Sequence, residues 1–484
     1  MIEKLRQLTK ETVIYGISTI LGRFLNFILV PFYTNIFIPE EYGIITNVYA
    51  LIAILNVVFL YGLDSSYLKF ATEVDLKDKK LVFSVPTITI LVSTSIISML
   101  IIFVQEPIMG FLSIGTDYSF VILLSLLILV FDTLAVIPFL YLRLENRAVL
   151  FTIIKVSNIV INVALNIVLI VGFKWGIEGV FVSNLTASLF SLMCVLPIYR
   201  KLFVFRFDKR IFRRFIRFGL PYLPAGLASI FIQVIDRPIV EQLTDLNQLG
   251  IYQANYKLGI FMMLFVSMFQ FAWQPFFLKN AKDPHAKELF AKVFTYFTIT
   301  GSLILVTLSL FIDDIVRISI LGRHLIGTAY WSGNNIVPIV LLGYLFNGFH
   351  VIFSAGLYIK EKSDSVPVIM GISAIVNIGA NFLLIPVWGI TGAAAATLAS
   401  YIVMAAGYYI VSQKLYFIKY EVLKILKLAI SIGCIGILYY IVIPEESINS
   451  LTKGLMTFLF ILLLILTGVI SKKEYEGFKT FIKR

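Results

Sequence analysis

Runs of about 20 consecutive apolar residues recur along the whole chain, and they constrain the fold more than any other feature. A helix of about 20 residues crosses the hydrocarbon core of a bilayer. The 484-residue chain is 59% hydrophobic and only 14% charged, whereas soluble domains are about 25% charged. No stretch between the runs is long enough for a separate soluble domain. The sequence therefore predicts an integral membrane protein.

The runs lack strict alternation, and a bilayer offers no water to backbone groups, so they predict an all-α fold. Fourteen transmembrane spans are expected, at approximately 12–37, 42–64, 81–104, 119–142, 148–173, 176–198, 216–240, 250–278, 293–312, 335–359, 366–387, 389–415, 422–443 and 451–470.

The distribution of lysine and arginine supports this count. The N-terminus, the C-terminus and every second connection are rich in both residues, as cytoplasmic segments are. The other connections hold only Lys174, Arg317, Arg323 and Lys453. We therefore expect both termini in the cytoplasm. The first run lacks a small-residue cleavage site, so it is interpreted as a retained span rather than a signal peptide.

The largest basic cluster, RKLFVFRFDKRIFRRFIR at Arg200–Arg217, lies midway between the sixth and seventh spans. It is typical of an amphipathic segment bound to anionic lipid, and we expect no nucleic-acid binding. The cluster divides the chain into a six-helix lobe (1–200), a cytoplasmic linker (201–217), a second six-helix lobe (218–415), and helices thirteen and fourteen with a basic tail (416–484).

Two sequence matches suggest that the lobes are copies. Pro31 and Gly43 have the same spacing as Pro238 and Gly250. The segment NVALNIVLIVGFKWGIEG (162–179) parallels NIGANFLLIPVWGITG (377–392) with a two-residue gap. Both copies start inside, which predicts a parallel pseudo-repeat plus an accessory helix pair.

Charged residues within or at the ends of the spans are the candidate site residues. A charge at the bilayer centre costs at least about 2.5–3.5 kcal/mol, so such residues should face protein or water. A shared cleft between the lobes would hold the predicted substrate-binding residues, which are Arg23, Asn26, Lys155, Gln233, Asp236, Arg237 and Lys257.

Structural roles are the alternative for each of these. Asp236 and Arg237 could clamp the kink that Pro238 introduces, and Arg23 could form an intramembrane ion pair. Lys155 and Lys257 could reach the membrane surface. The Asn162/Asn166 and Asn377/Asn381 pairs favour helix–helix contacts over ligand binding.

Other residues are assigned to coupling and motion. Candidates for ion or proton coupling are Asp64, Asp132, Asp236 and His350, although an isolated histidine is more often packed and satisfied. Candidate hinges are Pro31, Pro221, Pro224 and Pro238. Cys194 and Cys434 both lie in apolar runs, so we expect no disulfide framework, metal or cofactor.

Several segments together resemble the Wzx-type oligosaccharide-lipid flippases (O-antigen, capsule or exopolysaccharide translocases), which belong to the superfamily of MATE exporters and lipid II flippases. They are, in chain order, PEEYGIITNVYALI, YGLDSSYLKF, YLRLENRAVLF, FGLPYLPAGLASIFIQVIDRPIV and LGIYQANYKLG.

The resemblance implies two lobes around a central cavity in a bacterial cytoplasmic membrane. It also implies that a polyprenyl-pyrophosphate-linked oligosaccharide crosses from the inner to the outer leaflet by alternating access, for surface polysaccharide biosynthesis. Arg23, Asp236 and Arg237 match family sites by place, and Lys257 does so more loosely. Implied partners are the glycan, membrane lipids and other polysaccharide-assembly membrane proteins.

Rival functions remain open at this point. A MATE-like cation-coupled exporter or a lipid II flippase shares the topology. A membrane glycan polymerase or ligase needs a sizeable outer catalytic loop, and the longest outer connection is roughly 313–334. Because the sequence carries no Walker A, zinc, nucleophile-elbow or dinucleotide motif, we expect a transporter rather than an enzyme.

Overall fold

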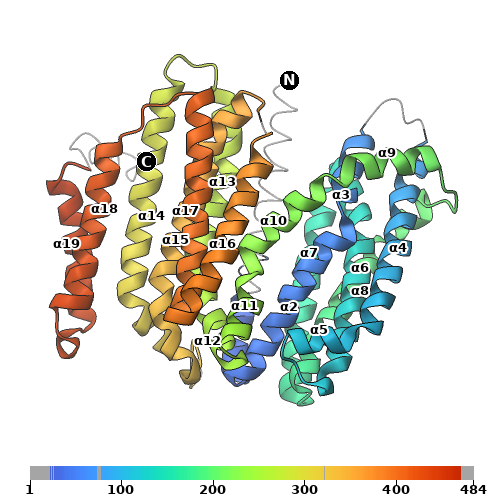
Figure 1. Ribbon diagram of the computed structural model, residues 1–484, viewed down its shortest axis with the longest axis horizontal. Helices are drawn as coiled ribbons and strands as arrows, with labels where there is room; N and C mark the ends of the chain where they lie inside the picture. Colours follow the sequence, from blue (N-terminus) through green and yellow to red (C-terminus); the bar gives the residue numbers. More distant parts are fainter. Residues whose placement is uncertain are drawn as a thin grey trace. The chain divides into compact units, whose positions relative to one another are not determined.

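The computed structural model describes Gly22, Phe24 and residues 27–72, 78–320, 322–362 and 364–469. These residues are almost entirely helical, as the apolar runs predict (Figure 1). The first helices are α2 (Pro39–Leu60), α3 (Leu63–Phe70), α4 (Lys79–Phe103), α5 (Gln105–Phe111), α6 (Ser119–Leu144), α7 (Ala148–Asn166), α8 (Gly176–Leu202), α9 (Lys209–Gly219), α10 (Tyr222–Val234), α11 (Asp236–Leu243) and α12 (Leu246–Tyr256).

The remaining helices are α13 (Ile260–Asn280), α14 (Ala286–Arg317), α15 (Val337–Ile359), α16 (Val366–Trp388), α17 (Ile390–Leu415), α18 (Val422–Ile437) and α19 (Ser450–Leu466). Short 3₁₀ segments are η1 (Thr116–Tyr118), η3 (Lys257–Gly259), η4 (Thr328–Ile336) and η6 (Glu445–Ser447), and π-helical segments are η2 (Ile167–Gly172) and η5 (Leu438–Val442). Two short strands, β1 (Ser319–Ile320) and β2 (Arg323–His324), pair in an antiparallel manner.

Among the described residues, 11 helices are long and apolar enough to cross a membrane, or up to 12 if the bent pair α9–α10 is one span. The chain is therefore a multi-pass membrane protein. The predicted total of fourteen additionally needs the run at 12–37, half of which lies outside the described residues, and α19, which has only 17 residues.

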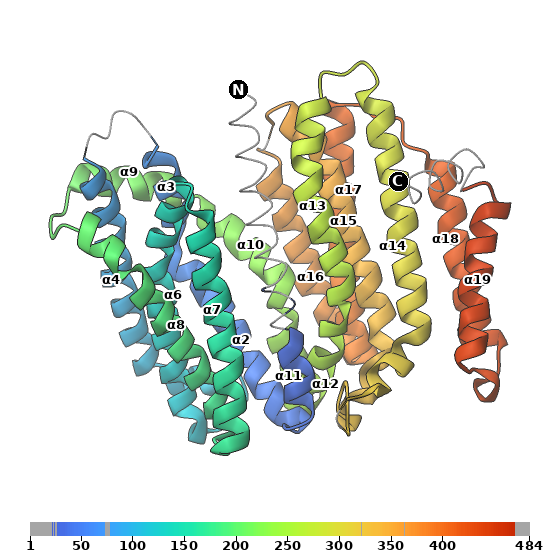
Figure 2. The same cartoon turned by 180° about the vertical axis from the view of Figure 1, so that it is seen from behind.

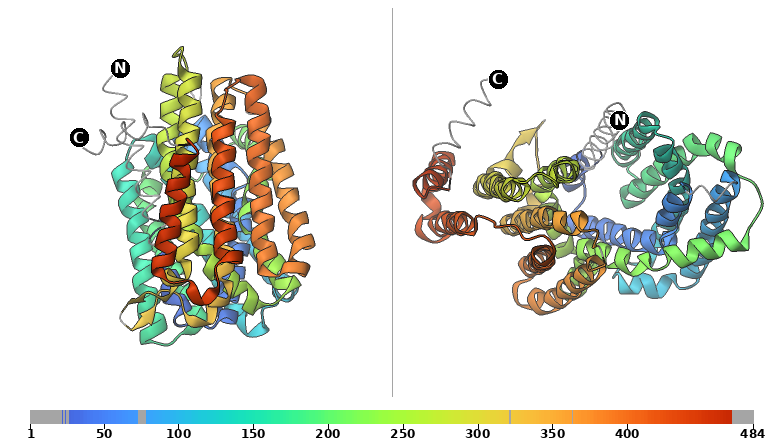
Figure 3. Two further views of the ribbon diagram at one scale, coloured as in Figure 1. Left: turned by 90° about the vertical axis from the view of Figure 1, so that its left-hand side faces the viewer. Right: turned by 90° about the horizontal axis from the view of Figure 1, so that it is seen from above.

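The chain divides into two compact units. One unit contains Met1–Lys257 and Pro367–Ser400, and the other contains Leu258–Val366 and Tyr401–Arg484. The first holds the close packing of α6 with α8 and of α2 with α12 (Figure 2). In the second, α18 and α19 pack against α14 through a buried apolar cluster that includes Leu310, Ile435 and Phe460 (Figure 3).

The crossing of α2 and α12 requires two glycines that the sequence aligns with each other. A Cβ atom on Gly43 of α2 would overlap the carbonyl oxygen of Leu246, where α12 begins. Reciprocally, a Cβ atom on Gly250 of α12 would overlap the carbonyl oxygen of Pro39, where α2 begins. The aligned glycines thus make equivalent contacts with each other's helix.

The second pair of matched segments also shares local geometry. Asn166 donates its side-chain amide to the backbone oxygen of Asn162 at 2.9 Å, and Asn381 does the same to Asn377 at 2.8 Å. The turns that follow contain Gly176 at φ 61° and Gly389 at φ 57°, left-handed values that glycine adopts without strain. The π-helix η2 lies within the longer copy, between its asparagines and its turn.

The basic linker forms the amphipathic helix α9, which packs on α3 and α4. Ile211 and Phe215 are buried, while Asp208 caps the N-terminus by accepting hydrogen bonds from two backbone amides. The hydroxyl of Ser66 donates to the carbonyl oxygen of Phe215 at 2.8 Å, and the Arg214 guanidinium lies 4.6 Å from the centre of the Phe70 ring. These contacts fix α9 against α3.

Candidate functional site

A break in the helix that begins at Tyr222 positions the charged pair noted in the sequence. The helix α10 ends at Val234 and α11 starts at Asp236. Pro238 has no amide hydrogen to donate to the carbonyl of Val234, so the break follows directly from the sequence. Gln233, one of the predicted binding residues, is exposed in the last turn of α10 and donates to the carbonyl oxygen of Ser229.

Asp236 is buried at the start of α11, with 2% of its surface exposed. One carboxylate oxygen accepts a hydrogen bond from the Tyr252 hydroxyl of α12 at 2.5 Å, and the other has no partner. Thr397 also interacts with the Tyr252 hydroxyl. Asp236 therefore connects the helix break to α12 through this hydrogen bond. This contact corresponds to the structural role that was the alternative to substrate binding for Asp236.

Arg237 is half-buried. Its Nε is buried without a hydrogen-bond acceptor. Within the described residues it forms no ion pair, although the charge of Asp236 attracts it. Lys257, in η3 after α12, lies close enough for the two positive charges to repel each other. The Lys257 side chain is exposed. Arg237 and Lys257 thus form a cationic pair with one nearby carboxylate, which is an arrangement suited to an anion.

A second polar group joins α6, α7 and α8. Asp132 interacts with the Ser188 side chain and with the charge of Lys155. The Lys155 amine also lies 4.2 Å from the centre of the Phe139 ring. The structure therefore brings together Asp132, a predicted coupling residue, and Lys155, a predicted substrate-binding residue. Each also has a further partner, Ser188 for Asp132 and Phe139 for Lys155.

The asparagines after Lys155 serve helix packing. Asn158 donates to the carbonyl oxygen of Ala187 at 2.6 Å and to the Ser191 hydroxyl at 3.0 Å. Asn166 accepts a hydrogen bond from Tyr33 at 2.8 Å. These contacts are the helix–helix role favoured by the sequence.

The other predicted residues are dispersed. Arg23 and Asn26 lie outside the described residues. Asp64 is partly buried in the first turn of α3, and His350 lies in α15, in the other compact unit, with its ring 5.3 Å from that of Tyr408. His350 Nδ1 is buried and unpartnered.

The predicted hinges coincide with helix features of different kinds. Pro221 and Pro224 stand at the start of α10, where the chain bends by 43° from α9. Pro31 lies within a helix, and its carbonyl oxygen accepts hydrogen bonds from Thr34 and Asn35. Whether any of them moves stays a prediction.

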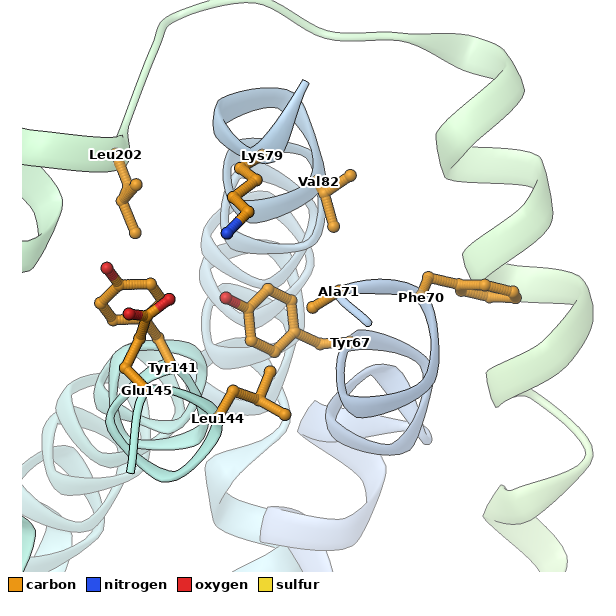
Figure 4. A pocket seen from close by; sticks show the side chains of 9 residues that line it. All are labelled: Tyr67, Phe70, Ala71, Lys79, Val82, Tyr141, Leu144, Glu145 and Leu202. Atoms are coloured by element: carbon orange, nitrogen blue, oxygen red, sulfur yellow. The ribbon is translucent and has the colours of Figure 1, made fainter. Parts of the chain in front are cut away.

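A small cavity of about 40 Å³ lies among the ends of α3, α4, α6 and α8 (Figure 4). Lys79, Tyr67, Tyr141 and Glu145 line it, together with Leu202. Burial raises the pKa of Tyr67, and the nearby Tyr141 and Glu145 raise it further. The cavity has room for water but not for a small-molecule ligand, whose sites enclose about 300–1,000 Å³.

Residues 8–281 match the family model described as "Polysaccharide biosynthesis protein". The chain belongs to this family. The match spans more than half of the chain, from the N-terminal region through α10, α11 and α12 to the end of α13. It therefore includes Asp236, Arg237 and Lys257. No curated protein matches the sequence significantly.

Solved structures show the same fold for this family member. The lipid II flippase MurJ in an inward closed conformation has a TM-score of 0.75 at 16% identity, covering 96% of this chain and 99% of that one. A multidrug resistance MATE transporter in an inward-facing conformation has a TM-score of 0.63 at 12% identity, with 81% and 94% covered. A Vibrio cholerae MATE transporter has a TM-score of 0.53 at 13% identity, covering 85% of this chain and 96% of that one.

The sequence did not identify two residues at the candidate site. Tyr252 holds Asp236, and Tyr42 of α2 lies close enough to Arg237 for an electrostatic interaction. Both are aromatic residues in apolar runs, where rings usually belong to the core or the interfacial belt. The only available signal was their position in the two segments PEEYG and GIYQANY that resemble the flippase family.

Proposed function

We propose that this protein is a flippase that moves a polyprenyl-pyrophosphate-linked oligosaccharide from the inner to the outer leaflet of the bacterial cytoplasmic membrane. Membership of the polysaccharide biosynthesis family and the fold shared with MurJ support the proposal. The observation that carries it is the cationic pair Arg237 and Lys257, which has no ion-pair partner among the described residues.

A pyrophosphate is the chemical complement of such a pair. The planar guanidinium of Arg237 can donate two parallel hydrogen bonds to phosphate oxygens, and the Lys257 amine adds a compact charge. Binding an anion there also removes the repulsion between the two cations. The isoprenoid tail would stay in the bilayer while the headgroup occupies this position.

The proposed architecture is the one expected from the sequence. It has fourteen transmembrane helices, lobes at 1–200 and 218–415 that alternate access, an accessory pair at 416–484, and cytoplasmic termini. In this arrangement α9 lies on the inner surface, where its exposed Arg210 and Arg213 contact anionic lipid. Gln233, Lys155, Arg23 and Asn26 remain proposed contacts to the substrate.

The test is complementation of a strain that lacks the gene, scored as surface glycan at matched protein levels. We expect Arg237→Ala to lose most of the surface glycan, because a hydrogen bond to a charged group contributes about 1.5–3 kcal/mol. The control is Arg323→Ala, an exposed arginine of β2, which should be silent. Full glycan display by Arg237→Ala would refute the headgroup role.

A second candidate function follows from the fold shared with MATE transporters. A cation-coupled exporter would give resistance to toxic organic cations on expression, with no change in surface glycan. That outcome would replace the flippase proposal.

A further inference from the structure

A buried carboxyl group joins the end of α11 to α2 and to the turn after α5. Glu241 of α11 has only 3% of its surface exposed. Its carboxyl group interacts with the side chains of Ser113, which follows α5, and Asn47, which is fully buried in α2. Three segments that are distant in the sequence therefore meet at one titratable group.

Two hydrogen bonds hold the same segments together. The Asn47 amide donates to the carbonyl oxygen of Leu112 at 3.2 Å, and the Gln242 amide donates to that of Phe111 at 3.3 Å. Gly43, about one turn before Asn47 on α2, makes the close crossing with α12. We call the four side chains of this contact the latch: Asn47, Ser113, Glu241 and Gln242.

The latch connects the two predicted lobes. Asn47 and Ser113 belong to the predicted first lobe (1–200), and Glu241 and Gln242 belong to the predicted second lobe (218–415). The predicted topology places these residues on the outer side of the membrane, opposite α9. Any movement that separates the lobes on that side therefore has to break the latch.

Two acceptor atoms inside the latch lack a donor. Oε2 of Glu241 and Oδ1 of Asn47 are buried from solvent and have no hydrogen-bond partner among the described residues. The donor therefore has to come from within the latch. A protonated carboxyl group supplies it, because its O–H group donates to an amide oxygen while its carbonyl oxygen accepts from a hydroxyl such as that of Ser113. An ionised carboxylate supplies no donor and leaves both oxygens unmatched.

The electrostatics of Glu241 act in the same direction. Burial raises the pKa of this carboxyl group, while Ser113 and Asn47 lower it in part. Separation of the lobes would return Glu241 to water and remove the effect of burial. The closed latch therefore binds a proton more tightly than the open one. Its stability is fully present at low pH and is lost as the pH rises through the raised pKa.

Glu241 is the titratable group that depends most on closure. The helices with extensive contacts to α11 are α2, α10 and α12. The charged residues of these helices, of α5, α11 and η1, and of the α12 N-cap are, besides Glu241 itself, Glu40, Glu41, Glu106, Asp117, Asp236, Arg237 and Asp245. Asp236 is bonded to Tyr252, and the other acids are exposed or partly exposed. The tyrosines of these helices titrate at about pH 10 or above.

We propose that the latch is a pH-sensitive device, which keeps the outer side closed while Glu241 is protonated and opens when Glu241 ionises. The proposal goes beyond the proposed function, because it concerns the conformation of the protein and does not depend on the substrate. Acid at the outer surface would hold the outer side closed, and a neutral or alkaline medium would favour opening.

The test is a distance measurement by electron paramagnetic resonance on spin-labelled, full-length protein in lipid nanodiscs. One label is attached at Gly110→Cys in α5, where a Cβ atom meets no atom within 4 Å. The other is attached at Asn247→Cys, an exposed position in the first turn of α12. The native thiols are removed by Cys194→Ala and Cys434→Ala. Spectra at about pH 5 and about pH 8 compare the two protonation states of Glu241.

We expect a single short distance at the lower pH and an additional, longer distance at the higher pH. Glu241→Gln keeps an amide donor but cannot ionise, so it should give the short distance alone at both values. Gln242→Ala removes the bond to Phe111 and should enlarge the longer component at both values. Glu40→Gln, which changes an exposed carboxylate of α2, is the matched control and should respond as the wild type does.

A wild-type distance that does not change with pH would overturn the proposal. So would a Glu241→Gln protein that keeps the wild-type response, or a Gln242→Ala protein with no larger long-distance component. Because no substrate is present, each of these results leaves the surface-glycan result for Arg237→Ala standing. Conversely, a silent Arg237→Ala in that assay would remove the headgroup role without affecting the measured distances.

Discussion

The reciprocal crossing of α2 and α12 gives a sharp prediction about Gly43 and Gly250. In each case a methyl group would overlap a backbone carbonyl oxygen, which cannot rotate away as a side chain can. Relief requires the two helices to separate. Overpacking of this kind costs about 1–3 kcal/mol. Alanine has a higher helix propensity than glycine, which stabilises the helix by about 1 kcal/mol and offsets part of this cost. The net loss in the free energy of unfolding of Gly43→Ala should therefore be at most about 2 kcal/mol.

Gly379 in α16 provides the control, since a Cβ atom there would meet no atom within 4 Å. Gly379→Ala should therefore be neutral or stabilised by about 1 kcal/mol. The double variant with Gly43→Ala and Gly250→Ala should cost little more than either single change, because one separation of the helices relieves both overlaps.

The assay is thermal unfolding of the purified variants, followed by tryptophan fluorescence. The order of apparent Tm should be Gly379→Ala at or above wild type, then Gly43→Ala and Gly250→Ala below it, with the double variant close to the single ones. A Gly43→Ala protein as stable as Gly379→Ala would refute the close approach. If the loss of stability in the double variant equals the sum of the two single losses, the two overlaps are not relieved by one separation of α2 and α12.

Two further predictions concern stability. The Lys453 amine of α19 is buried and bonded to Asp314 at 2.5 Å. Asp314→Ala should lower the free energy of unfolding by about 2 kcal/mol, because the buried amine then has no partner. Thermal unfolding measures the change. This loss is smaller than the about 3–5 kcal/mol expected for breaking a fully buried ion pair, because Asp314 is partly exposed. Lys453→Met should lower the free energy of unfolding by less than Asp314→Ala does. A larger loss in Lys453→Met would contradict this account. Because the folded-state pKa of Glu241 is raised, its contribution to stability is present at low pH and lost as pH rises. Glu241→Gln should thus raise the Tm at pH 7.5, with the gain disappearing near pH 4, whereas a gain independent of pH would argue against ionisation as the cause.

The sequence predicted most of the fold because bilayer insertion depends on composition over about 20 residues. The runs that contain α4, α6, α8 and α16 were located for this reason. Pro238 likewise predicted a disturbance of the helix, and the structure interrupts the helix at Ile235, between α10 and α11. Unit boundaries and exact helix ends depend on packing between distant segments, and hydropathy carries no information about that packing.

The site was less predictable. Charges within apolar runs stand out in the sequence, so Asp236, Arg237 and Lys257 were proposed as site residues. Their partners were not, because the Tyr252–Asp236 hydrogen bond depends on how α11 folds back against α12. Glu241 was not among the predicted site residues, since its burial depends on neighbours that the sequence does not place beside it.

The π-helical turn at Ile167–Gly172 has a consequence for how the two halves diverged. Widening one turn lets a helix absorb an added residue without unwinding, so the asparagines before it and the glycine turn after it keep their local geometry. After a duplication, one copy could thus change length inside the bilayer while the positions that contact other helices were preserved. Insertions are usually confined to loops, whereas here part of the added length is accommodated in the last turns of the candidate span Ala148–Gly172.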